Sequence, residues 1–332
     1  DPIDEKRARL AAAKAEAATR ITFKETAEKY IAAQRAGWKN AKHADQWEST
    51  LVTYAYPVIG HLSVAAVDTA HVRKILELIW STKTETASRV RGRIESILDY
   101  ATACKFRSGE NPARWRGHLD QILPRRTKVS KVKHHPAMPY DDVPAFMARL
   151  RAMESTSARA LEFTILTAAR TNEAIAATWS EFDLTAKVWT VPAERMKASK
   201  EHSVPLAPRV VEILNGLPRI KNENFVFPGA RRGRPLSNMA MLELVRGMPD
   251  TSDFTVHGFR SSFRDWAGER TNFPREVIEH ALAHQLRDKT EKAYSRGNLL
   301  DKRRALMGAW ACYCSAPKRE SGEVVTLRRA AP

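Results

Sequence analysis

Apolar residues recur at helical spacing along most of this chain, whereas only a few short runs are β-prone. A stripe at the helical period covers one face of an amphipathic helix, so the pattern limits the fold to a mainly helical one. Within residues 21–115 we predict a four-helix domain, from three stripes and an aromatic stretch. The stripes contain Phe23, Ala27, Tyr30 and Ile31, then Val72, Ile75, Leu76 and Ile79, then Val90, Ile94, Ile97, Leu98 and Ala101, and the stretch contains Trp47, Leu51 and Tyr54.

Residues 139–315 are predicted to form a second domain of the α+β class. The β-prone runs 188–191 and 203–206 flank residues 194–201, which suits a hairpin with a mobile loop. Residues 225–228 are a further candidate strand. Helical patterns occupy residues 142–151, 158–169, 239–246, 258–269, 275–283 and 302–313. The predicted fold class is therefore mainly α with a small antiparallel β-sheet.

Three segments fall outside these two domains. Residues 1–20 are Ala-rich with charges on every side, which is typical of a linker helix between domains. Residues 116–138 are predicted to be a basic linker, because Arg125–Lys133 holds five basic residues and no acidic one. Such a run is either a solvated loop or lies along a phosphate backbone. Residues 316–332 are left as a C-terminal tail.

The net charge narrows the class of partner. With 55 Lys and Arg against 38 Asp and Glu, the chain carries a formal charge of +17. That surplus indicates a protein that binds a polyanion, most readily nucleic acid. The alternative is a soluble protein that is basic without binding a polyanion. No apolar run reaches the roughly 18 residues of a membrane span, and the first 20 residues contain no signal-peptide core. Three cysteines without a disulfide framework or a C-x-x-C pair indicate a reducing cytosol.

Several charged residues of the second domain are candidates for chemistry. Arg170 ends an apolar helix three residues before Glu173, which can orient its guanidinium, although a helix cap explains Arg170 equally well. His257 and Arg260, in the sequence HGFR, share one helix face and can grip an oxyanion together. Lys197 lies in the predicted hairpin loop, where a lysine is ordinarily solvated.

A histidine pair and a tyrosine near the end of the second domain are further candidates. His280 and His284 have the spacing of a zinc-binding pair, but the sequence offers no third ligand, so we predict no metal site. Tyr294 lies between Lys292 and Arg296. Packing gives a tyrosine little reason to lie among charges, so Tyr294 is a candidate for chemistry.

The ordered set Arg, Lys, His-x-x-Arg, His and Tyr resembles the tyrosine recombinase family, in particular phage and genomic-island integrases of the P4-like branch. TAARTNE resembles the first-arginine box, ERMK the hairpin lysine, HGFR and ALAH the histidine boxes, and AYSR the nucleophile segment. The resemblance covers nearly the whole chain. It implies a core-binding, SAM-like helical domain at 21–115, a catalytic domain at 139–315, and at 1–20 the remnant of an arm-binding domain. Ala169 and Ala283 replace the Gly of many members, which is harmless if the backbone there is helical.

The resemblance implies phosphoryl transfer from DNA to a tyrosine without a metal, a nucleotide or another cofactor. Arginine guanidinium groups supply the positive charge at the non-bridging oxygens, and a lysine protonates the 5′-oxygen that leaves as a hydroxyl. The 3′-phosphotyrosyl product can be attacked by another 5′-hydroxyl, so strands are exchanged without ATP. The implied roles are nucleophile for Tyr294, phosphate binding for Arg170, Arg260 and His284, base for His257, general acid for Lys197, and orientation of the cluster for Glu173.

The implied function is site-specific recombination that integrates, and with a cofactor protein excises, a prophage or genomic island. The implied partners are double-stranded DNA at attachment sites, a homotetramer in the synaptic complex, an excisionase and a host DNA-bending protein, in the bacterial cytoplasm at the nucleoid. The alternatives are a type IB topoisomerase-like enzyme and a catalytically inactive DNA-binding regulator; a relaxase is disfavoured because His134–His135 does not match its metal motif. The predicted DNA contacts are Lys39, Lys42, Thr86, Arg89, Arg93, Arg125, Arg126 and Lys128.

Overall fold

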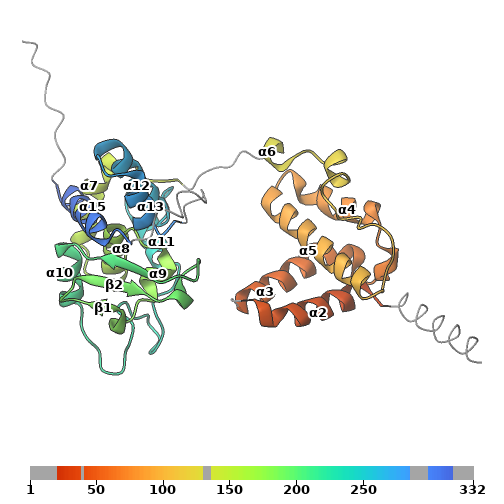
Figure 1. Cartoon of the computed structure of the whole chain (residues 1–332), viewed down its shortest axis with the longest axis horizontal. Helices are drawn as coiled ribbons and strands as arrows, with labels where there is room; N and C mark the ends of the chain where they lie inside the picture. Colours follow the sequence, from red (N-terminus) through yellow and green to blue (C-terminus); the bar gives the residue numbers. More distant parts are fainter. Residues whose placement is uncertain (1–20, 39–40, 130–135, 285–297, 317–332) are drawn as a thin grey trace, which may run out of the picture. The chain divides into compact units, whose positions relative to one another are not determined.

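The computed structural model describes residues 21–38, 41–129, 136–284 and 298–316. These residues form two compact units, one within 1–133 and the other within 134–332 (Figure 1). Each unit has its own core of buried apolar side chains, so each is described separately. The prediction of a mainly helical chain with a small antiparallel sheet is confirmed.

In the described part of the first unit, helices form at each predicted stripe. They are α2 (Phe23–Gln34), α3 (Ala41–Thr50) with its π-helical continuation Leu51–Gly60, α4 (Thr69–Trp80) and α5 (Thr84–Ala103). The short α6 (Arg126–Val129) forms within the predicted linker, where no helix was predicted. Phe23, Ile75 and Ile94 represent three stripes in one core, and each is at most 1% exposed. The apolar face of each helix is thus buried against the others.

Side-chain caps fix where two of these helices begin. The Thr22 hydroxyl accepts the Glu25 N–H at 3.2 Å, and the Glu25 carboxylate accepts the Thr22 N–H at 2.8 Å. Asp68 Oδ1 accepts the His71 N–H at 2.9 Å in the same way before α4. Because the first N–H groups of a helix have no partner within it, such caps set the starting residue.

The core of the first unit continues past residue 115, where the basic linker was predicted to begin. Leu119 and Leu123 are buried in this core. The Trp80 indole stacks on Trp115 with ring centroids 5.4 Å apart and donates to the Pro124 carbonyl at 2.9 Å. The first residues of the predicted linker therefore belong to the first unit.

The second unit combines helices with one sheet. Its elements are α7 (Val143–Arg151), α8 (Thr156–Thr167), α9 (Thr171–Ile175), β1 (Phe182–Asp183), β2 (Val188–Val191), β3 (His202–Pro205), α10 (Pro208–Gly216), α11 (Ala240–Gly247), α12 (Gly258–Arg270), α13 (Arg275–Ala281) and α15 (Leu300–Tyr313). β1, α9 and α10 were not predicted. The candidate strand at 225–228 is wrong, because Phe225 and Pro228 form only isolated bridges.

The three strands run in the order β1-β2-β3, and both pairs are antiparallel. In the β2–β3 hairpin, Val188 pairs with Pro205 and Val191 pairs with His202. The loop between them contains Lys197, as the sequence predicted. The hairpin therefore carries its lysine at one end of the sheet.

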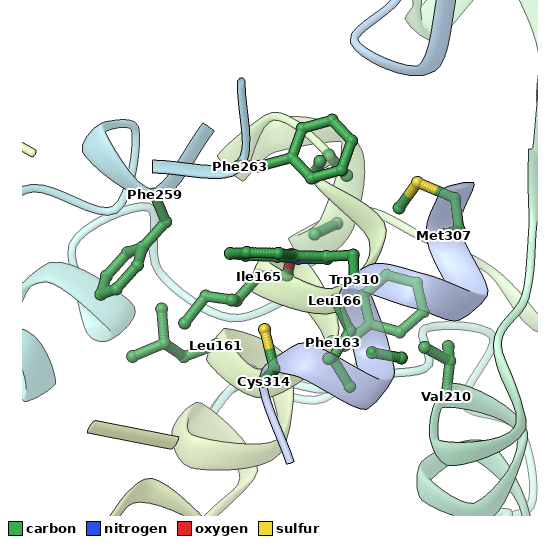
Figure 2. Close-up of a cluster of buried hydrophobic side chains, with 14 of the residues drawn as sticks. Leu161, Phe163, Ile165, Leu166, Val210, Phe259, Phe263, Met307, Trp310 and Cys314 are labelled. Atoms are coloured by element: carbon green, nitrogen blue, oxygen red, sulfur yellow. The ribbon is translucent and has the colours of Figure 1, made fainter. Parts of the chain in front are cut away.

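The core of the second unit is built on α8 and α15. Figure 2 shows the Trp310 indole between Phe263 and Ile165. The indole N–H donates to the Ile165 carbonyl at 2.9 Å, and the Phe263 ring meets it edge-on at 5.5 Å. Because the buried indole keeps a hydrogen bond, it stabilises the contact of the two helices without leaving a polar group unpaired.

A buried carboxylate joins three arginines beside this core. Glu162 is fully buried on α8 and accepts hydrogen bonds from Arg151 at 2.7 Å, Arg159 at 2.8 Å and Arg209 at 2.9 Å. Burial raises the pKa of Glu162, but the guanidinium hydrogen bonds outweigh it, and the pKa lies below its ordinary value. Glu162 therefore stays ionised and fastens α7 and α10 to α8.

Candidate active site

Arg170 lies in the short connection between α8 and α9, where the backbone is extended. The Glu173 carboxylate accepts both the Arg170 backbone N–H at 2.9 Å and its Nη1 at 2.6 Å. Nη2 donates to the Ala283 carbonyl at 3.2 Å. The predicted orientation of Arg170 by Glu173 is therefore present, and it caps α9 at the same time.

Arg260 lies one turn into α12 and is only 6% exposed. Its guanidinium donates to the carbonyls of Ala168 and Leu282, the latter at 2.6 Å, and lies 3.3 Å from His284 Nε2. Burial lowers the pKa of Arg260 to about 10, and the charge of Arg170 lowers it in the same direction. Arg260 is therefore still charged at neutral pH, and the site combines two guanidinium groups with the Glu173 carboxylate that pairs with Arg170.

Two successive carbonyls just after α13 hold this cluster. The Leu282 carbonyl accepts a hydrogen bond from Arg260 at 2.6 Å, and the Ala283 carbonyl accepts one from Arg170 at 3.2 Å. The last carbonyls of a helix have no partner within it and lie at the negative end of its dipole. The carbonyls of residues 282 and 283, the α13 carbonyl run, therefore suit positively charged donors.

The backbone at Ala283 departs from the expectation that this alanine lies in a helix. α13 ends at Ala281, and Ala283 has φ 49°, in the left-handed region. Ala168, which ends α8, has φ 50°. The left-handed conformation directs the Ala283 and Ala168 carbonyls to the two arginines, at a steric cost that glycine would not have.

His284 is held by a carboxylate on the same segment. Its Nδ1 lies 2.6 Å from Glu279 Oε2, while Glu279 Oε1 accepts from Arg264 Nε at 3.0 Å. Because Arg260 donates to Nε2, the neutral ring must carry its proton on Nδ1 and donate it to Glu279. Burial lowers the pKa of His284, and the positive charge of Arg260 lowers it in the same direction.

His257 immediately precedes α12, one turn before Arg260, and its side chain is exposed. The next residue must be glycine, because a Cβ on Gly258 would lie 2.4 Å from the Pro136 carbonyl oxygen. The start of the second unit thus packs directly against the HGFR segment, and this contact leaves His257 facing outward.

Lys197 is exposed in the hairpin loop, and both sides of that loop are fastened. On one side Arg195 donates to the Glu173 carbonyl and forms an ion pair with Glu181. On the other side Arg303 on α15 donates to the Ser203 carbonyl at 2.6 Å. The loop is thus anchored two residues before and six residues after Lys197.

The predicted nucleophile Tyr294 and the predicted DNA contact Lys39 lie outside the described residues, as does the side chain of Lys42. On α5, Arg89 is exposed and pairs with Glu85 at 3.2 Å, and Thr86 is partly exposed.

The predicted DNA contact at Arg93 is wrong in this structure. Arg93 is 7% exposed, donates to the Gln46 carbonyl and the Thr50 hydroxyl, and lies 5.4 Å from the Trp47 ring. Its guanidinium therefore fastens α5 to α3. The cation–π contact with Trp47 adds to this packing role.

The three basic positions before the second unit are exposed, but one of them is paired. Arg126 Nη1 lies 2.6 Å from the Glu85 carboxylate on α5, whereas Arg125 and Lys128 form no ion pair among the described residues. Arg125 and Lys128 can therefore bind a phosphate directly, whereas Arg126 would first have to exchange its ion pair with Glu85 for one with the phosphate.

Sequence reasoning missed Arg195 and Glu279. Arg195 lies two residues before Lys197 and contacts the Glu173 carbonyl, 22 residues earlier in the chain. Glu279 meets His284 through the turn that follows α13. No periodicity in the sequence reveals either contact. Among the described residues no three His, Cys, Asp or Glu side chains gather as metal ligands, and no helix is long and apolar enough to cross a membrane.

Comparison with known proteins gives the family. A model of the phage integrase central domain matches residues 23–118, and a model of the phage integrase family matches residues 137–299. Prophage integrase IntZ of Escherichia coli K12 is 32% identical over 87% of this chain and 70% of its own length. The integrase of Enterobacteria phage P4 is 29% identical over 91% of this chain and 71% of its own length. A lambda integrase tetramer bound to a Holliday junction has a similar fold, with a TM-score of 0.65 at 16% identity over 84% of this chain and 82% of that chain. This chain therefore belongs to the phage integrase family of tyrosine recombinases.

Proposed function

We propose that this recombinase cuts and rejoins attachment-site DNA through a 3′-phosphotyrosyl link on Tyr294, to integrate and, with a partner protein, excise a prophage or genomic island. The observation that carries this proposal is the pair Arg170 and Arg260, both fixed on the α13 carbonyl run. Two guanidinium groups held side by side on backbone oxygens form a preorganised site for an anion. Because the net positive charge of this chain favours DNA as a partner, the anion that fits this site is a phosphodiester of DNA.

The arginines keep donors for the phosphate after their structural bonds are counted. A guanidinium has five N–H groups, of which Arg170 uses one for the Glu173 carboxylate and one for the Ala283 carbonyl. The remaining donors can bind the non-bridging oxygens, on which charge grows during in-line attack. Because these donors are already oriented, little reorganisation is needed as the transition state forms.

His284 is proposed to add one donor to the phosphate. In the described arrangement its Nε2 accepts from Arg260, so it must gain a proton before it can donate. The Glu279 carboxylate on Nδ1 favours that proton, and an incoming phosphate adds a second negative charge nearby. DNA binding should therefore raise the pKa of His284 from its lowered value and recruit it to the site.

The chemical step is a transfer between two oxygens at phosphorus. The Tyr294 oxygen attacks, His257 takes up the phenolic proton, and the bond from phosphorus to the 5′-oxygen breaks. Lys197 gives its proton to that oxygen, so a free 5′-hydroxyl leaves. Attack of another strand's 5′-hydroxyl on the phosphotyrosyl link reverses the step and restores Tyr294.

DNA partners are proposed from the similar structures and from the surface charges. Lambda integrase has been solved as a dimer on a core site and as a tetramer on a Holliday junction. We infer a tetramer of this chain on two attachment sites, in the bacterial cytoplasm at the nucleoid, assisted by an excisionase and a host DNA-bending protein. Phosphate contacts are assigned to Lys39, Lys42, Thr86, Arg89, Arg125, Arg126 and Lys128.

A nicked suicide duplex tests the proposal. Its sequence is taken from the junctions of the circularised element that carries this gene. Cleavage beside the nick releases a short strand, which traps the covalent complex. The wild-type chain should form a protein–DNA adduct, and Tyr294→Phe should bind the same duplex without forming one.

The other outcomes separate the competing functions. An adduct with Tyr294→Phe would assign the nucleophile elsewhere, to Tyr313 first. No adduct with the wild-type chain would indicate a DNA-binding regulator. Relaxation of a supercoiled plasmid without recombinant products would indicate a topoisomerase-like activity.

A further inference from the structure

The backbone turn after α13 brings a carboxylate and a histidine together. The His284 N–H donates to the Glu279 carbonyl at 2.9 Å, the Ala283 N–H donates to the His280 carbonyl at 3.1 Å, and Ala283 is left-handed. These two bonds form a Schellman motif, which folds the chain after a helix back over the last turn. The motif therefore places Glu279 beside His284, whose Nδ1 lies 2.6 Å from Glu279 Oε2.

The same carboxylate has a second partner, Arg264 on α12, the helix beside α13 (Figure 1). Arg264 Nε donates to Glu279 Oε1 at 3.0 Å, so each carboxylate oxygen has its own partner. Arg264 follows Arg260 by one helical turn, about 6 Å further along α12. Both arginines face α13, because Arg260 donates to the Leu282 carbonyl. Arg260 and Arg264 therefore form a row of guanidinium groups that begins at the proposed phosphate site.

The three side chains of this cluster differ in their exposure to solvent. The Arg264 side chain is 51% exposed and that of His284 is 41% exposed, whereas that of Glu279 is only 13% exposed. A phosphate can therefore reach Arg264 from solvent while Glu279 stays covered. Arg264 is thus the member that can exchange its partner, because a DNA phosphate competes with Glu279 for the guanidinium.

The charge of Glu279 is the one that favours a proton on His284. Burial raises the pKa of Glu279, but the hydrogen bonds from His284 and Arg264 outweigh it, and the pKa lies below its ordinary value. The carboxylate is therefore ionised at neutral pH. Burial and the charges of Arg260 on α12 and Arg170 before α9 lower the pKa of His284, whereas Glu279 raises it. Any cation paired with Glu279 weakens this support.

We propose that Arg264 is a further phosphate-binding residue and that Glu279 is the positioning residue through which it acts on His284: DNA takes Arg264 from Glu279, and the carboxylate is left to His284 alone. The inference rests on the proposed role of His284 as a donor to the scissile phosphate. In the free chain Arg264 offsets part of the Glu279 charge, and the neutral His284 ring accepts from Arg260. On DNA the freed carboxylate favours a second ring proton, so Nε2 becomes a donor.

An NMR titration of the full chain without DNA tests the shared carboxylate. The His284 ring signal is identified by its absence in His284→Gln. Glu279→Gln keeps an acceptor for Nδ1 but removes the charge, so the pKa of His284 should fall by about 1. Arg264→Gln removes the competing cation, so the pKa of His284 should rise. Glu212→Gln is the matched control, because Glu212 on α10 also pairs with an arginine, Arg209 at 3.1 Å, and it should leave the pKa of His284 unchanged.

Opposite shifts in Glu279→Gln and Arg264→Gln distinguish a shared charge from a structural role, because a loosened turn would move the pKa of His284 in one direction in both variants. Shifts of the same sign, or no shift in either variant, would overturn the positioning role. If Glu279→Gln does not fold, Arg264→Gln still decides, since the wild-type Arg264 side chain is half exposed. A raised pKa of His284 in that variant supports the inference, and an unchanged or lowered one overturns it.

Duplex DNA tests whether Arg264 changes its partner. The Tyr294→Phe background keeps the complex non-covalent. Binding should raise the pKa of His284 in this background, and the rise should be smaller when Arg264→Gln is added, because the carboxylate is already free. Arg264→Gln should also reduce the slope of log affinity against log salt by roughly 1, the value for one lost phosphate contact. An equal rise or an unchanged slope would show that Arg264 stays on Glu279 in the complex, which overturns the proposal.

Single-turnover cleavage of the nicked duplex links the cluster to the reaction. Glu279→Gln should cleave about 10-fold more slowly than wild type at pH 8 and within about threefold of it at pH 6, where the His284 ring gains its proton without the carboxylate. An equal loss at both pH values would assign Glu279 a purely structural role and overturn the inference. A wild-type chain that forms no adduct at any pH would refute the proposed recombinase function instead. The titration without DNA would then still confirm or overturn the shared carboxylate.

Discussion

Replacing Ala283 with glycine should stabilise the second unit, although the change removes a methyl group. Ala283 has φ 49°, and a left-handed conformation costs an L-residue about 1–2 kcal/mol. Glycine removes that cost but gives the unfolded chain about 0.4–1 kcal/mol of extra conformational freedom. The Ala283 methyl is partly buried against the core, so its loss costs part of the roughly 0.8 kcal/mol of a buried methyl. The net effect raises the free energy of unfolding by about 0.5 kcal/mol. The Ala283 carbonyl still accepts from Arg170, so the cleavage rate should not change.

Ala168 is the matched comparison for this prediction. It has φ 50°, within one degree of Ala283, so glycine relieves the same strain at the same entropic cost. Ala168 is only 2% exposed, and losing a buried methyl costs about 0.8 kcal/mol. Ala168→Gly should therefore leave the free energy of unfolding nearly unchanged.

Amide hydrogen exchange measures both variants in the intact chain. The slowest amides of α8 report global opening of the second unit. A gain of about 0.5 kcal/mol slows their exchange roughly 2-fold in Ala283→Gly, whereas Ala168→Gly should exchange like wild type. Equal or faster exchange in Ala283→Gly would show that the left-handed backbone carries no strain there, and the reasoning would be refuted.

Three other perturbations test the electrostatic arguments, and a fourth tests whether cleavage needs a metal ion. Glu162→Gln should lower the free energy of unfolding by about 3 kcal/mol, because three arginines lose their shared carboxylate; a denaturation midpoint equal to wild type would contradict this. Because folding lowers the pKa of His202 from 6.5 to about 4, the unfolded chain binds its proton first, so the free energy of unfolding should fall by about 1 kcal/mol per unit as pH drops through this window. His202→Gln should remove the contribution of His202 to this pH dependence. The same pH dependence of the free energy of unfolding in His202→Gln and wild type would contradict the prediction. Replacing Arg125 and Lys128 with Ala should reduce the slope of log affinity against log salt by roughly 2, as measured on duplex DNA, and an unchanged slope would exclude phosphate contacts there. Cleavage should persist in excess EDTA, because guanidinium groups supply the positive charge; a loss that Mg²⁺ restores would overturn that mechanism.

The sequence predicted those parts of the fold that depend on local periodicity. Residues 188–191 form a strand at the predicted bounds, and the apolar stripes correspond to helices. The end of α8 was predicted two residues late, because Ala168 adopts a left-handed conformation without the glycine that usually signals one. β1 has two residues and is too short to show any period.

The candidate site was only partly predictable, for a different reason. Arg170, Arg260 and His284 were predicted, and the structure brings them together. Arg93 looked like a surface residue because it flanks an apolar stripe, yet a helix more than 40 residues earlier covers it. Arg195 acquires its role from the Glu173 carbonyl, 22 residues earlier in the chain, which no local pattern can reveal.

The α13 carbonyl run has a consequence for how such a site tolerates mutation. The acceptors for Arg170 and Arg260 are main-chain oxygens, which every amino acid carries. No particular side chain at residues 282 and 283 is therefore needed to supply an acceptor, provided that the backbone keeps its path. Leu282 is buried and residue 283 is left-handed, so this turn tolerates apolar residues at 282 and a small residue at 283. An insertion or deletion in the turn would instead displace both acceptors at once, so the length of the turn is fixed more strictly than its composition.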